Sequence, residues 1–494
     1  MMNNAEIVLV FPGPNRRQLG GALLHLPLST LSLAAWLRRD EVYRNRISIV
    51  DMNIQLLDAA LFQKAQVVGF SAMTGQQVRY ALHAAEFVRK TNPHAVLVWG
   101  GIHPSLLPEQ TATHPLVDVV VKGEGEEAFR DVVDAVFEGK DMSGLPGTYS
   151  QTPSGEIITG QPRGFIDMDD LPLAAYDLID IKRYYGIESQ FDYQSSRGCP
   201  FRCGFCYNKV FSGRNWRAKS AEKVVDELAF LKHEYDVKTF AFADDEFFID
   251  IKRAEGILRG LLDRGLGCGI IASCRLDIIR KFSPENLRMF REAGMVHLFF
   301  GAESGSDKTL SRISKDITAA DIVEGARITA EAGIRPFLSF MSGFPGETFA
   351  DFKETLDLIG RLWRTHPLIT VNGIFPFNAY PGTELFRRSA ELGLAVPSTL
   401  DEWGDWTFQY EPDNPWLTPR MKRWMETAFY IVRFEYYLSR YGDRHHNNWR
   451  VWLLKILVSP LSLSAAVRWR MKWFGFALEW KLFAYLARRT FGYL

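Results

Sequence analysis

The chain is poor in cysteine, has no excess of either charge and contains no apolar run long enough to cross a membrane. Five cysteines in 494 residues are too few, and odd in number, for a disulfide framework. The 58 basic residues equal the 58 acidic ones, so the overall charge gives no reason to expect nucleic acid as a partner. The longest apolar candidate, Val451–Val467, is interrupted by Lys455 and Pro460. These absences argue against a disulfide-stapled secreted domain and against a membrane-spanning protein.

The first residues also lack the features of a secretory signal. Met1–Asn4 carries no Lys or Arg, and Ile7–Val10 is too short for the apolar part of such a signal. Free cysteines persist in a reducing compartment, so we expect a cytoplasmic protein. The length fits two to four domains.

The first 145 residues alternate between strand and helix patterns. Helical spacing of apolar residues covers Leu26–Arg38, Gln76–Thr91 and Glu126–Glu138. This alternation predicts an α/β fold with a doubly wound, Rossmann-like parallel sheet, whose ligands bind beyond the carboxyl ends of the strands. No G-x-G-x-x-G opens a helix after the first strand, so a dinucleotide is not expected. The predicted strands are Glu6–Phe11, Arg46–Asp51, Ala65–Ser71, Ala95–Gly100 and Val117–Val121.

A second series of six strand–helix units begins near residue 189 and predicts a partial (β/α)6 barrel. Active sites of such barrels lie at the carboxyl ends of the strands. We expect domains at 1–145 and 189–395, a connector at 146–188, and a helical, aromatic region at 396–494. The predicted barrel strands are Tyr193–Arg197, Thr239–Ala243, Gly269–Cys274, Val296–Gly301, Pro336–Ser342 and Ile369–Phe375, and the predicted helices are Ala221–Tyr235, Lys252–Arg264, Pro284–Ala293, Ala319–Ala332 and Thr348–Arg364.

Three of the five cysteines lie close together, directly after the first predicted barrel strand. Cys199, Cys203 and Cys206 form a C-x3-C-x2-C pattern. Thiolates suit iron–sulfur clusters and zinc. Zinc normally takes a fourth protein ligand, but the motif holds no His, and Cys268 and Cys274 are distant in sequence. A four-iron cluster held by three cysteines leaves one iron open, which could bind and reduce a small molecule.

In this motif the chain resembles the radical S-adenosylmethionine enzymes. The later segments Gly301–Ser306, Ser342–Thr348 and Asn378–Thr383 follow the cysteines in the order found in radical enzymes of the anaerobic cyclase type. The resemblance covers roughly residues 5–390. It implies that Cys199, Cys203 and Cys206 hold a catalytic [4Fe-4S] cluster.

Polar residues at the ends of the barrel strands are candidates for binding S-adenosylmethionine. Asp244 and Asp245 are adjacent carboxylates that suit its ammonium group, with helix capping as the alternative. Arg275 could bind its carboxylate bidentately. The resemblance adds aromatic neighbours of the nucleoside and further contacts to the ribose and the amino-acid end, which are Phe205, Tyr207, Glu303, Ser304, Ser342 and Tyr380.

The N-terminal segments Gly69–Ser71, Trp99–Pro104 and Lys122–Glu126 resemble the cobalamin-binding domain fused to many radical enzymes. Small residues at the strand ends would admit a bulky corrinoid. The D-x-H-x-x-G motif that supplies a cobalt ligand elsewhere is absent, so we expect no protein histidine on cobalt; a domain that has lost cobalamin is the alternative. The candidate contacts are Ser71, Thr74, Gly100, Gly101, His103, Gly123 and Glu124.

The resemblance implies a cobalamin-dependent radical S-adenosylmethionine methyltransferase. Such an enzyme would methylate an unactivated carbon of a small-molecule or lipid-like substrate through a 5′-deoxyadenosyl radical and methylcobalamin, with electrons from a flavodoxin or ferredoxin. A radical cyclase or rearrangement enzyme with the same domains is the alternative, and an iron–sulfur or corrinoid carrier is the non-enzymatic one. A methylthiotransferase acting on tRNA fits less well, because residues 1–198 contain no cysteine.

The C-terminal region is basic although the whole chain is neutral. Residues 420–494 hold 14 Lys and Arg against 4 Asp and Glu. Trp and Phe alternate with these cations over Asn448–Arg489, a pattern that fits a helix lying on a membrane surface or helices packed as a lid over the barrel mouth. We expect the lid, with a weak membrane-surface contact as the alternative.

Overall fold

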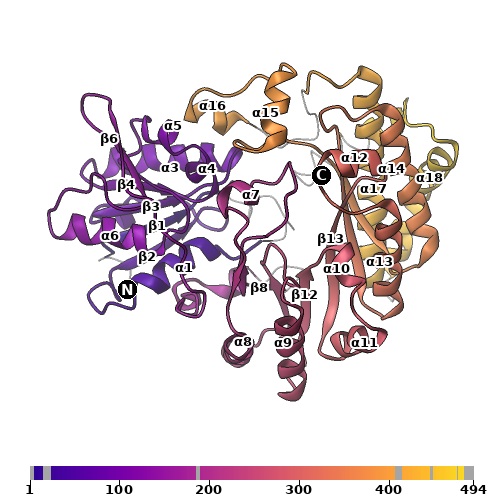
Figure 1. The fold of residues 1–494 in the computed structure, drawn as a ribbon, viewed down its shortest axis with the longest axis horizontal. Helices are drawn as coiled ribbons and strands as arrows, with labels where there is room; N and C mark the ends of the chain where they lie inside the picture. Colours follow the sequence, from indigo (N-terminus) through magenta and orange to yellow (C-terminus); the bar gives the residue numbers. More distant parts are fainter. Residues whose placement is uncertain are drawn as a thin grey trace.

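The computed structural model describes residues 5–14, 24–184, 190–406, 414–444, 449–475, 477–482 and 485. Figure 1 shows two sheets beside each other, with the N-terminal sheet in indigo and purple and the second sheet in pink and orange. The two long helices near the end of the chain, α17 (Pro419–Arg444) and α18 (Trp449–Met471), lie at the outer edge of the second sheet, whereas α16 (Leu400–Asp405) lies against α3 (Gln76–Thr91) of the N-terminal part. The predicted α/β architecture, with two parallel sheets and a helical C-terminal region, is confirmed.

The N-terminal sheet has the strand order β2-β1-β3-β4-β5-β6-β7. Its first five strands are parallel, and the order reverses between β1 and β3, which is the point where ligands bind in doubly wound folds. The strands are β1 (Ile7–Phe11), β2 (Ile47–Asp51), β3 (Val67–Ser71), β4 (Val96–Gly100), β5 (Val119–Val121), β6 (Thr148–Gln151) and β7 (Ile157–Thr159).

Alternate residues of β1 pack on the two faces of this sheet. Ile7 and Leu9 belong to the core that contains Leu31 of α1, whereas Val8 and Val10 belong to the core that contains Val78 of α3. An apolar run without polar alternation therefore marks a strand buried on both faces. The helices of this part are α1 (Leu28–Leu37), α2 (Ala59–Phe62), α3 (Gln76–Thr91), α4 (Ile102–Leu106), α5 (Pro108–Ala112) and α6 (Glu126–Phe137).

Two antiparallel strands extend the N-terminal sheet beyond residue 145. β6 pairs with β5, and β7 pairs with β6, so the sheet continues to Thr159. The rest of the predicted connector holds two short 3-10 helices, Tyr176–Leu178 and Ile181–Arg183. The division into domains stays a prediction, and this hairpin belongs with the first sheet.

The second sheet has six parallel strands in the order β8-β11-β12-β13-β14-β15, as expected for a partial barrel. Its first strand differs from the prediction. Phe191 pairs with Phe240 in β8, whereas Ser196 and Arg197 form a separate short hairpin with β10. The strands are β8 (Gln190–Tyr193), β9 (Ser196–Arg197), β10 (Arg217–Ala218), β11 (Thr239–Phe242), β12 (Gly269–Ser273), β13 (Met295–Glu303), β14 (Arg335–Ser342) and β15 (Thr370–Pro376).

The helices of the barrel begin at polar caps that the sequence places directly before them. Ser283, Thr318 and Thr348 each form a reciprocal capping box with the third residue of the helix that follows. The helices that follow the cysteine loop are α7 (Asn208–Phe211), α8 (Ala221–Tyr235), α9 (Ile251–Asp263), α10 (Leu276–Ile279), α11 (Pro284–Glu292), α12 (Asp307–Arg312), α13 (Ala319–Glu331), α14 (Phe349–Thr365) and α15 (Glu384–Glu391). The next helix, α16 (Leu400–Asp405), packs on α3 of the N-terminal part.

Two long helices complete the chain, α17 (Pro419–Arg444) and α18 (Trp449–Met471). α17 packs along β15, the edge strand of the barrel sheet, and so covers an edge that would otherwise be open. A Cβ at Gly343 would lie 3.1 Å from Met425 in the first turns of α17 and 3.3 Å from Leu417 just before the helix, so this stretch reaches the rim of the barrel. A lid formed by the rest of the C-terminal region stays a prediction. Among the described helices, none is both long enough and apolar enough to cross a bilayer.

Candidate functional site

One cavity connects the carboxyl edge of the N-terminal sheet with the cysteine loop of the barrel. Its volume is about 360 Å³. The N-terminal sheet contributes the ends of β1, β3, β4 and β5, and the barrel contributes residues on both sides of the cysteines, among them Gly198 and Tyr207. The cavity therefore lies at the predicted switch point of the first sheet and faces the predicted active edge of the second.

Five of the seven predicted cobalamin residues line this cavity: Ser71, Gly100, Gly101, Gly123 and Glu124. Thr74 and His103 do not line it. His103 is fully buried, its Nδ1 lies 3.2 Å from the Thr74 hydroxyl, and its ring lies 5.5 Å from that of Trp403 in α16. Burial lowers the pKa of His103 to about 4, so the imidazole is neutral and belongs to the packing beneath α16.

The strand ends leave room for a broad cofactor. A Cβ at Gly123 would meet no atom within 4 Å, and a Cβ at Gly100 would lie 3.7 Å from the nearest atom. Gly101 has a φ of +93°, and a Cβ there would lie 2.8 Å from the backbone nitrogen of Ala72. The small residues thus serve both the open space and the close packing of strand ends, and they fit a corrinoid lying across this edge.

The cysteine loop is held between the β9–β10 hairpin and α7. Gly198, directly before Cys199, has a φ of +85°, and a Cβ there would lie 1.9 Å from the carbonyl oxygen of Asn215. No other residue type fits that approach. Cys206 donates its backbone N–H to the carbonyl of Cys203 at 3.3 Å, which turns the loop back on itself. The three thiols are partly buried and form no disulfide.

The electrostatics of the loop suit thiolates that are bound to metal. Burial raises the pKa of Cys199 to about 11 and that of Cys206 to about 12, because a bare thiolate is poorly solvated there. Binding to iron replaces the proton and shares the charge. No three His, Cys, Asp or Glu side chains in the described part of the chain already surround a single metal position. Cluster cysteines bind different irons, so they do not converge on one point, and the loop fits an iron–sulfur cluster.

Arg275 lies directly against the cysteine loop. Its guanidinium is 3.8 Å from the ring centroid of Phe201, and its Nη1 is 3.9 Å from the sulfur of Cys203. It also donates to the carbonyl of Lys315 at 2.7 Å and to Asp277 at 2.8 Å. Arg275 is thus at the predicted place, but most of its donors are used within the protein, and a contact with a ligand carboxylate stays a prediction.

The predicted aromatic residues gather on two sides of the loop. Phe205 packs 5.9 Å from Phe344, in an apolar cluster below the ends of β14 and β15. Tyr207 lies 5.3 Å from Tyr380 and also lines the shared cavity. The structure therefore brings Phe205, Tyr207 and Tyr380 to the same loop from distant parts of the sequence.

The two adjacent aspartates after β11 have different environments. Asp244 is buried and accepts hydrogen bonds from the Ser195 N–H at 2.7 Å and from the hydroxyls of Ser195 and Ser196 at 2.6 Å. Asp245 accepts from the Gly198 N–H at 3.0 Å and lines the cavity. Asp244 anchors the chain that leads into the cysteine loop, and Asp245 is the better placed of the two for a ligand.

The rim residues of β13 and β14 are bound to neighbouring protein groups. Glu303 has a φ of +59° and forms a buried ion pair with Lys315 at 2.8 Å. The Ser304 hydroxyl lies 3.1 Å from that of Thr355. Ser342 donates to the carboxylate of Glu347 at 3.1 Å. Of these three predicted residues, Glu303 is the charged one. Its partner Lys315 lies close enough to Cys203 for that thiol to raise the pKa of Lys315, so the Glu303–Lys315 pair lies near the cysteine loop.

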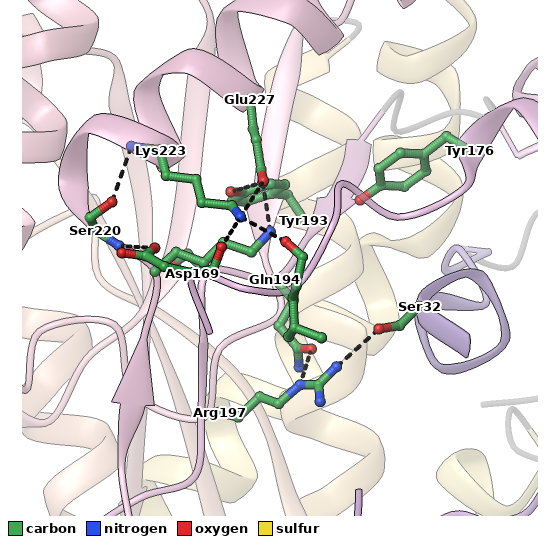
Figure 2. Close-up of polar contacts among 12 residues, drawn as sticks. Ser32, Asp169, Tyr176, Tyr193, Gln194, Arg197, Ser220, Lys223 and Glu227 are labelled. Carbon is green, nitrogen blue, oxygen red and sulfur yellow. Dashed lines mark hydrogen bonds and ion pairs between the residues drawn. The ribbon is translucent and has the colours of Figure 1, made fainter. Parts of the chain in front are cut away.

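Two arginines of the β9–β10 hairpin tie the barrel to the N-terminal sheet. Arg217 holds Glu124 bidentately at 2.7 and 3.0 Å, and Arg197 donates to Glu126 at 2.6 Å. Figure 2 shows Arg197 reaching Ser32 of α1 at 3.1 Å, with Gln194 bonded to its Nε. All four charged residues line the cavity, so this clamp sets how the cysteine loop faces the strand ends.

The same hairpin is fixed from below by a second buried pair. Glu227 accepts from Tyr193 and from Lys219, both at 2.6 Å, as Figure 2 shows for Tyr193. Lys219 follows β10 directly, and burial lowers its pKa although Glu227 opposes this. The hairpin next to the cysteine loop is thus held by ion pairs on two sides, to Glu124 and Glu126 of the N-terminal part and to Glu227 of α8.

The sequence did not single out Lys315, Arg197, Arg217 or Glu246. Lys315 lies in a loop after α12, and no motif marks it. Glu246 is buried beside the predicted aspartates, and burial raises its pKa to about 8. The run Asp-Asp-Glu at 244–246 could have pointed to Glu246, but the arginine clamp depends on partners more than 70 residues away.

Two family models match the chain. The Radical SAM superfamily matches residues 193–359, and the B12 binding domain matches residues 22–133. The first range contains the cysteine loop and four of the six barrel strands in full, and the second contains four of the seven strands of the first sheet.

The chain is similar to an uncharacterized methyltransferase of Pyrococcus horikoshii, with 32% identity over 333 residues, covering 67% of this chain and 70% of that protein. It is 28% identical to the anaerobic magnesium-protoporphyrin IX monomethyl ester cyclase of Rubrivivax gelatinosus, covering 73% of this chain and 62% of the cyclase. The fold is shared with the radical S-adenosylmethionine methyltransferase TsrM from Kitasatospora setae, solved with cobalamin and a [4Fe-4S] cluster bound. That match has a TM-score of 0.64 and 19% identity, over 80% of this chain and 76% of TsrM.

Proposed function

The chain belongs to the radical S-adenosylmethionine enzymes that carry an N-terminal cobalamin-binding domain, and we propose that it transfers a methyl group to an unactivated carbon. Its cofactors are a [4Fe-4S] cluster, S-adenosylmethionine and cobalamin. When bound, they supply the radical that activates a substrate carbon and the methyl group that carbon receives. The substrate that we propose is a small molecule or a lipid-like compound.

The observation that carries this proposal is the shared cavity. Gly100, Gly101 and Gly123 of the cobalamin-binding domain line the same space as Tyr207 and Asp245 of the barrel. Methyl transfer between cofactors bound at two edges needs a substrate position that both edges reach. A cavity lined by only one edge would have favoured a carrier or a domain that has lost its cofactor.

The residues of the barrel edge have distinct proposed tasks. Cys199, Cys203 and Cys206 would hold three irons of the cluster. Arg275 lies against Cys203 and would balance the negative charge of the cluster thiolates. The apolar group of Phe205, Phe344 and Phe377 would keep water from the cluster side of the loop.

We propose that the ion pairs between Arg197, Arg217, Glu124 and Glu126 orient the two sheets relative to each other and take no part in the chemical steps. Arg217 and Arg197 of the barrel hold Glu124 and Glu126 of the first sheet, with both carboxylates buried. Fixing the two edges relative to each other would hold the reacting groups at a constant separation, which is the main contribution that a protein makes to such chemistry.

Methyl transfer is tested with S-adenosylmethionine that carries an isotopic label in its methyl group. The enzyme is reconstituted anaerobically with iron, sulfide and cobalamin, and then incubated with extract of its source cells. We expect labelled methyl in a product other than the protein, together with S-adenosylhomocysteine and 5′-deoxyadenosine. Deoxyadenosine with no labelled product and no S-adenosylhomocysteine would instead favour a cyclase or rearrangement enzyme.

The cyclase has a specific observation in its favour, since one relative of that name covers 73% of the chain. Its identity, however, is lower than that of the methyltransferase relative. A flavodoxin or ferredoxin is the electron donor that we propose, because the cluster needs single electrons at low potential. We also propose a cytoplasmic location, where the free thiols would stay reduced.

A further inference from the structure

The end of the described chain presents apolar side chains to solvent. On α18, Leu463, Val467 and Met471 are 67%, 42% and 68% exposed. They follow each other at intervals of four residues, so they lie along one face of the helix. Beyond the helix four more large side chains are exposed, and we call the whole set the C-terminal apolar face: Leu463, Val467, Met471, Trp473, Leu478, Leu482 and Tyr485.

The opposite side of α18 is already packed. Ala465, Arg468 and Trp469 are buried, and the Trp469 ring lies 4.7 Å from that of Trp363 in α14. The apolar face is therefore additional to the face that holds the helix on the protein. Helices that are apolar all round are normally buried or in contact with lipid, and a large contiguous apolar surface on a protein marks an interaction site.

The charges around this face are positive. Arg470 and Lys481 are exposed, and Lys472 lies between Trp469 and Asp357. The nearby acid Glu479 accepts from Arg468 at 2.6 Å, so its charge is neutralised within the protein. Residues 420–494 as a whole hold 14 basic and 4 acidic side chains. A partner that fits this face is apolar inside and negatively charged at its surface.

We propose that the C-terminal apolar face binds the surface of an anionic lipid bilayer. Leucine, valine and methionine would enter the boundary between headgroups and acyl chains, and Arg470 and Lys481 would remain among the anionic headgroups. Trp473 and Tyr485, which are 50% and 52% exposed, belong to the residue types that prefer this boundary. Figure 1 places α18 at the outer edge of the molecule, away from the N-terminal sheet, so a flat surface can approach it.

A second copy of the chain is a poorer partner for the same face. In a twofold dimer the same patch meets itself, so the basic side chains of one copy, Arg470 and Lys481 among them, would be brought close to those of the other. Like charges brought together in this way oppose association. The proposal concerns binding only, and it does not depend on the reaction that the enzyme catalyses.

Flotation with vesicles tests the proposal on the full chain. Vesicles of phosphatidylcholine and phosphatidylglycerol in equal amounts should carry the protein, and vesicles of phosphatidylcholine alone should bind it much more weakly. The variant Leu463→Gln, Met471→Gln, Leu478→Gln should bind the anionic vesicles at least about tenfold more weakly, because three exposed apolar groups are lost. Arg470→Gln and Lys481→Gln should each weaken binding about fivefold, less at high salt.

The matched control removes exposed leucines elsewhere. Leu56 and Leu262 are 70% and 40% exposed, far from α18 in the sequence, and Leu56→Gln, Leu262→Gln should bind the anionic vesicles like the unmodified chain. Equal binding by the triple variant of the C-terminal apolar face and this control would overturn the proposal. So would a concentration-dependent dimer, seen by light scattering, that the triple variant abolishes, because the face would then join two copies. Iron and corrinoid contents should be the same in all variants, which separates this test from that of the proposed reaction.

Discussion

The two sheets meet at one cavity with edges of opposite character. At the N-terminal edge the strands β4 and β5 are followed or ended by small residues, Gly100, Gly101 and Gly123, beside the clamp residues Glu124 and Glu126. The barrel edge is dense in charge: Arg197, Arg217 and Asp245 line the cavity. Glu246, Arg275 and the Glu303–Lys315 pair are buried close to the cysteine loop, outside the cavity lining. The strand ends of the N-terminal sheet thus leave the backbone accessible at the glycines, whereas the barrel edge presents charged side chains held in place by hydrogen bonds and ion pairs.

This difference follows from what each edge would bind. A corrinoid is broad, and an edge without side chains lets it lie close to the backbone. S-adenosylmethionine carries an ammonium, a carboxylate and a sulfonium, and such groups need charged partners held in place. The charged edge is costly to fold, because each buried ion must be paired, whereas the glycine edge mostly costs conformational entropy.

The largest effect is expected from the charged edge. Cys203→Ala removes one of the three thiolates, and we expect the [4Fe-4S] cluster and all deoxyadenosine formation to be lost. The N-terminal edge should still bind corrinoid. Iron content, cluster absorbance and corrinoid absorbance after anaerobic reconstitution measure the two edges separately.

Cys268→Ala provides the matched control, since Cys268 is a buried cysteine just before β12 and outside the loop. It should keep both cluster and corrinoid. Full iron content in Cys203→Ala would contradict the assignment of the ligand. Loss of corrinoid together with the cluster would mean that the two edges are not independent.

The reverse experiment fills the open edge. A Cβ at Gly100 would lie 3.7 Å from the nearest atom, so Gly100→Leu is compatible with the strand and adds a side chain to the lining of the cavity. We expect corrinoid binding to weaken about a hundredfold, since a side chain of about four carbons must be displaced or accommodated. Titration with cobalamin followed by absorbance measures this, and cluster content should not change. An unaltered affinity would place the corrinoid elsewhere.

The elements with strong apolar periodicity could be predicted closely from the sequence. β6 and β7 of the first sheet lie in the predicted connector and were not predicted as strands. The helix Gln76–Thr91 was predicted with its observed bounds, and the parallel strands were predicted within one or two residues at each end. The exception is the first barrel strand. Its position depends on the pairing of Phe191 with Phe240, and the polar run from Gln194 to Arg197 gave no sign that it turns away into a hairpin.

The candidate site was predictable where a motif carries it and not where distant partners decide it. The cysteines stand in a recognisable spacing, and five strand-end residues of the first sheet do line the cavity. Asp244 was a reasonable ligand candidate, but Ser195 and Ser196 occupy its oxygens. Likewise Glu124 was predicted to contact cobalamin, whereas in the fold Arg217 holds both of its oxygens. Such pairings join residues that no local pattern relates.

Glu124 therefore provides a third test, because it belongs to the N-terminal edge of the cavity but forms an ion pair with Arg217 of the barrel edge. Glu124→Gln leaves Arg217 without its carboxylate and weakens the contact with Arg197. Breaking a buried ion pair should lower the free energy of unfolding by about 4 kcal/mol, measured by urea denaturation without cofactors. Asp177→Asn, in an exposed pair with Arg38, should change it by less than about 1 kcal/mol. If Glu124→Gln altered only corrinoid affinity, Glu124 would be a ligand contact and not part of the clamp.

The smallest effect concerns Glu347, which is buried at the charged rim, where it accepts from Ser342 and from the backbone N–H groups of Gly343 and Phe344. Burial raises its pKa to about 7 in the folded chain, against 4.5 as the ordinary value. The folded state therefore binds more protons than the unfolded state between these values, and the contribution of Glu347 to stability falls as the pH rises through that window. Relative to Glu347→Gln, the free energy of unfolding of the unmodified chain should fall by about 2 kcal/mol from pH 4.5 to pH 7. Urea denaturation of both proteins across that range measures the difference, which cancels the other titrating groups. A constant difference would mean that the three hydrogen bonds keep the carboxylate ionised throughout, and that the charged edge holds this anion without a proton.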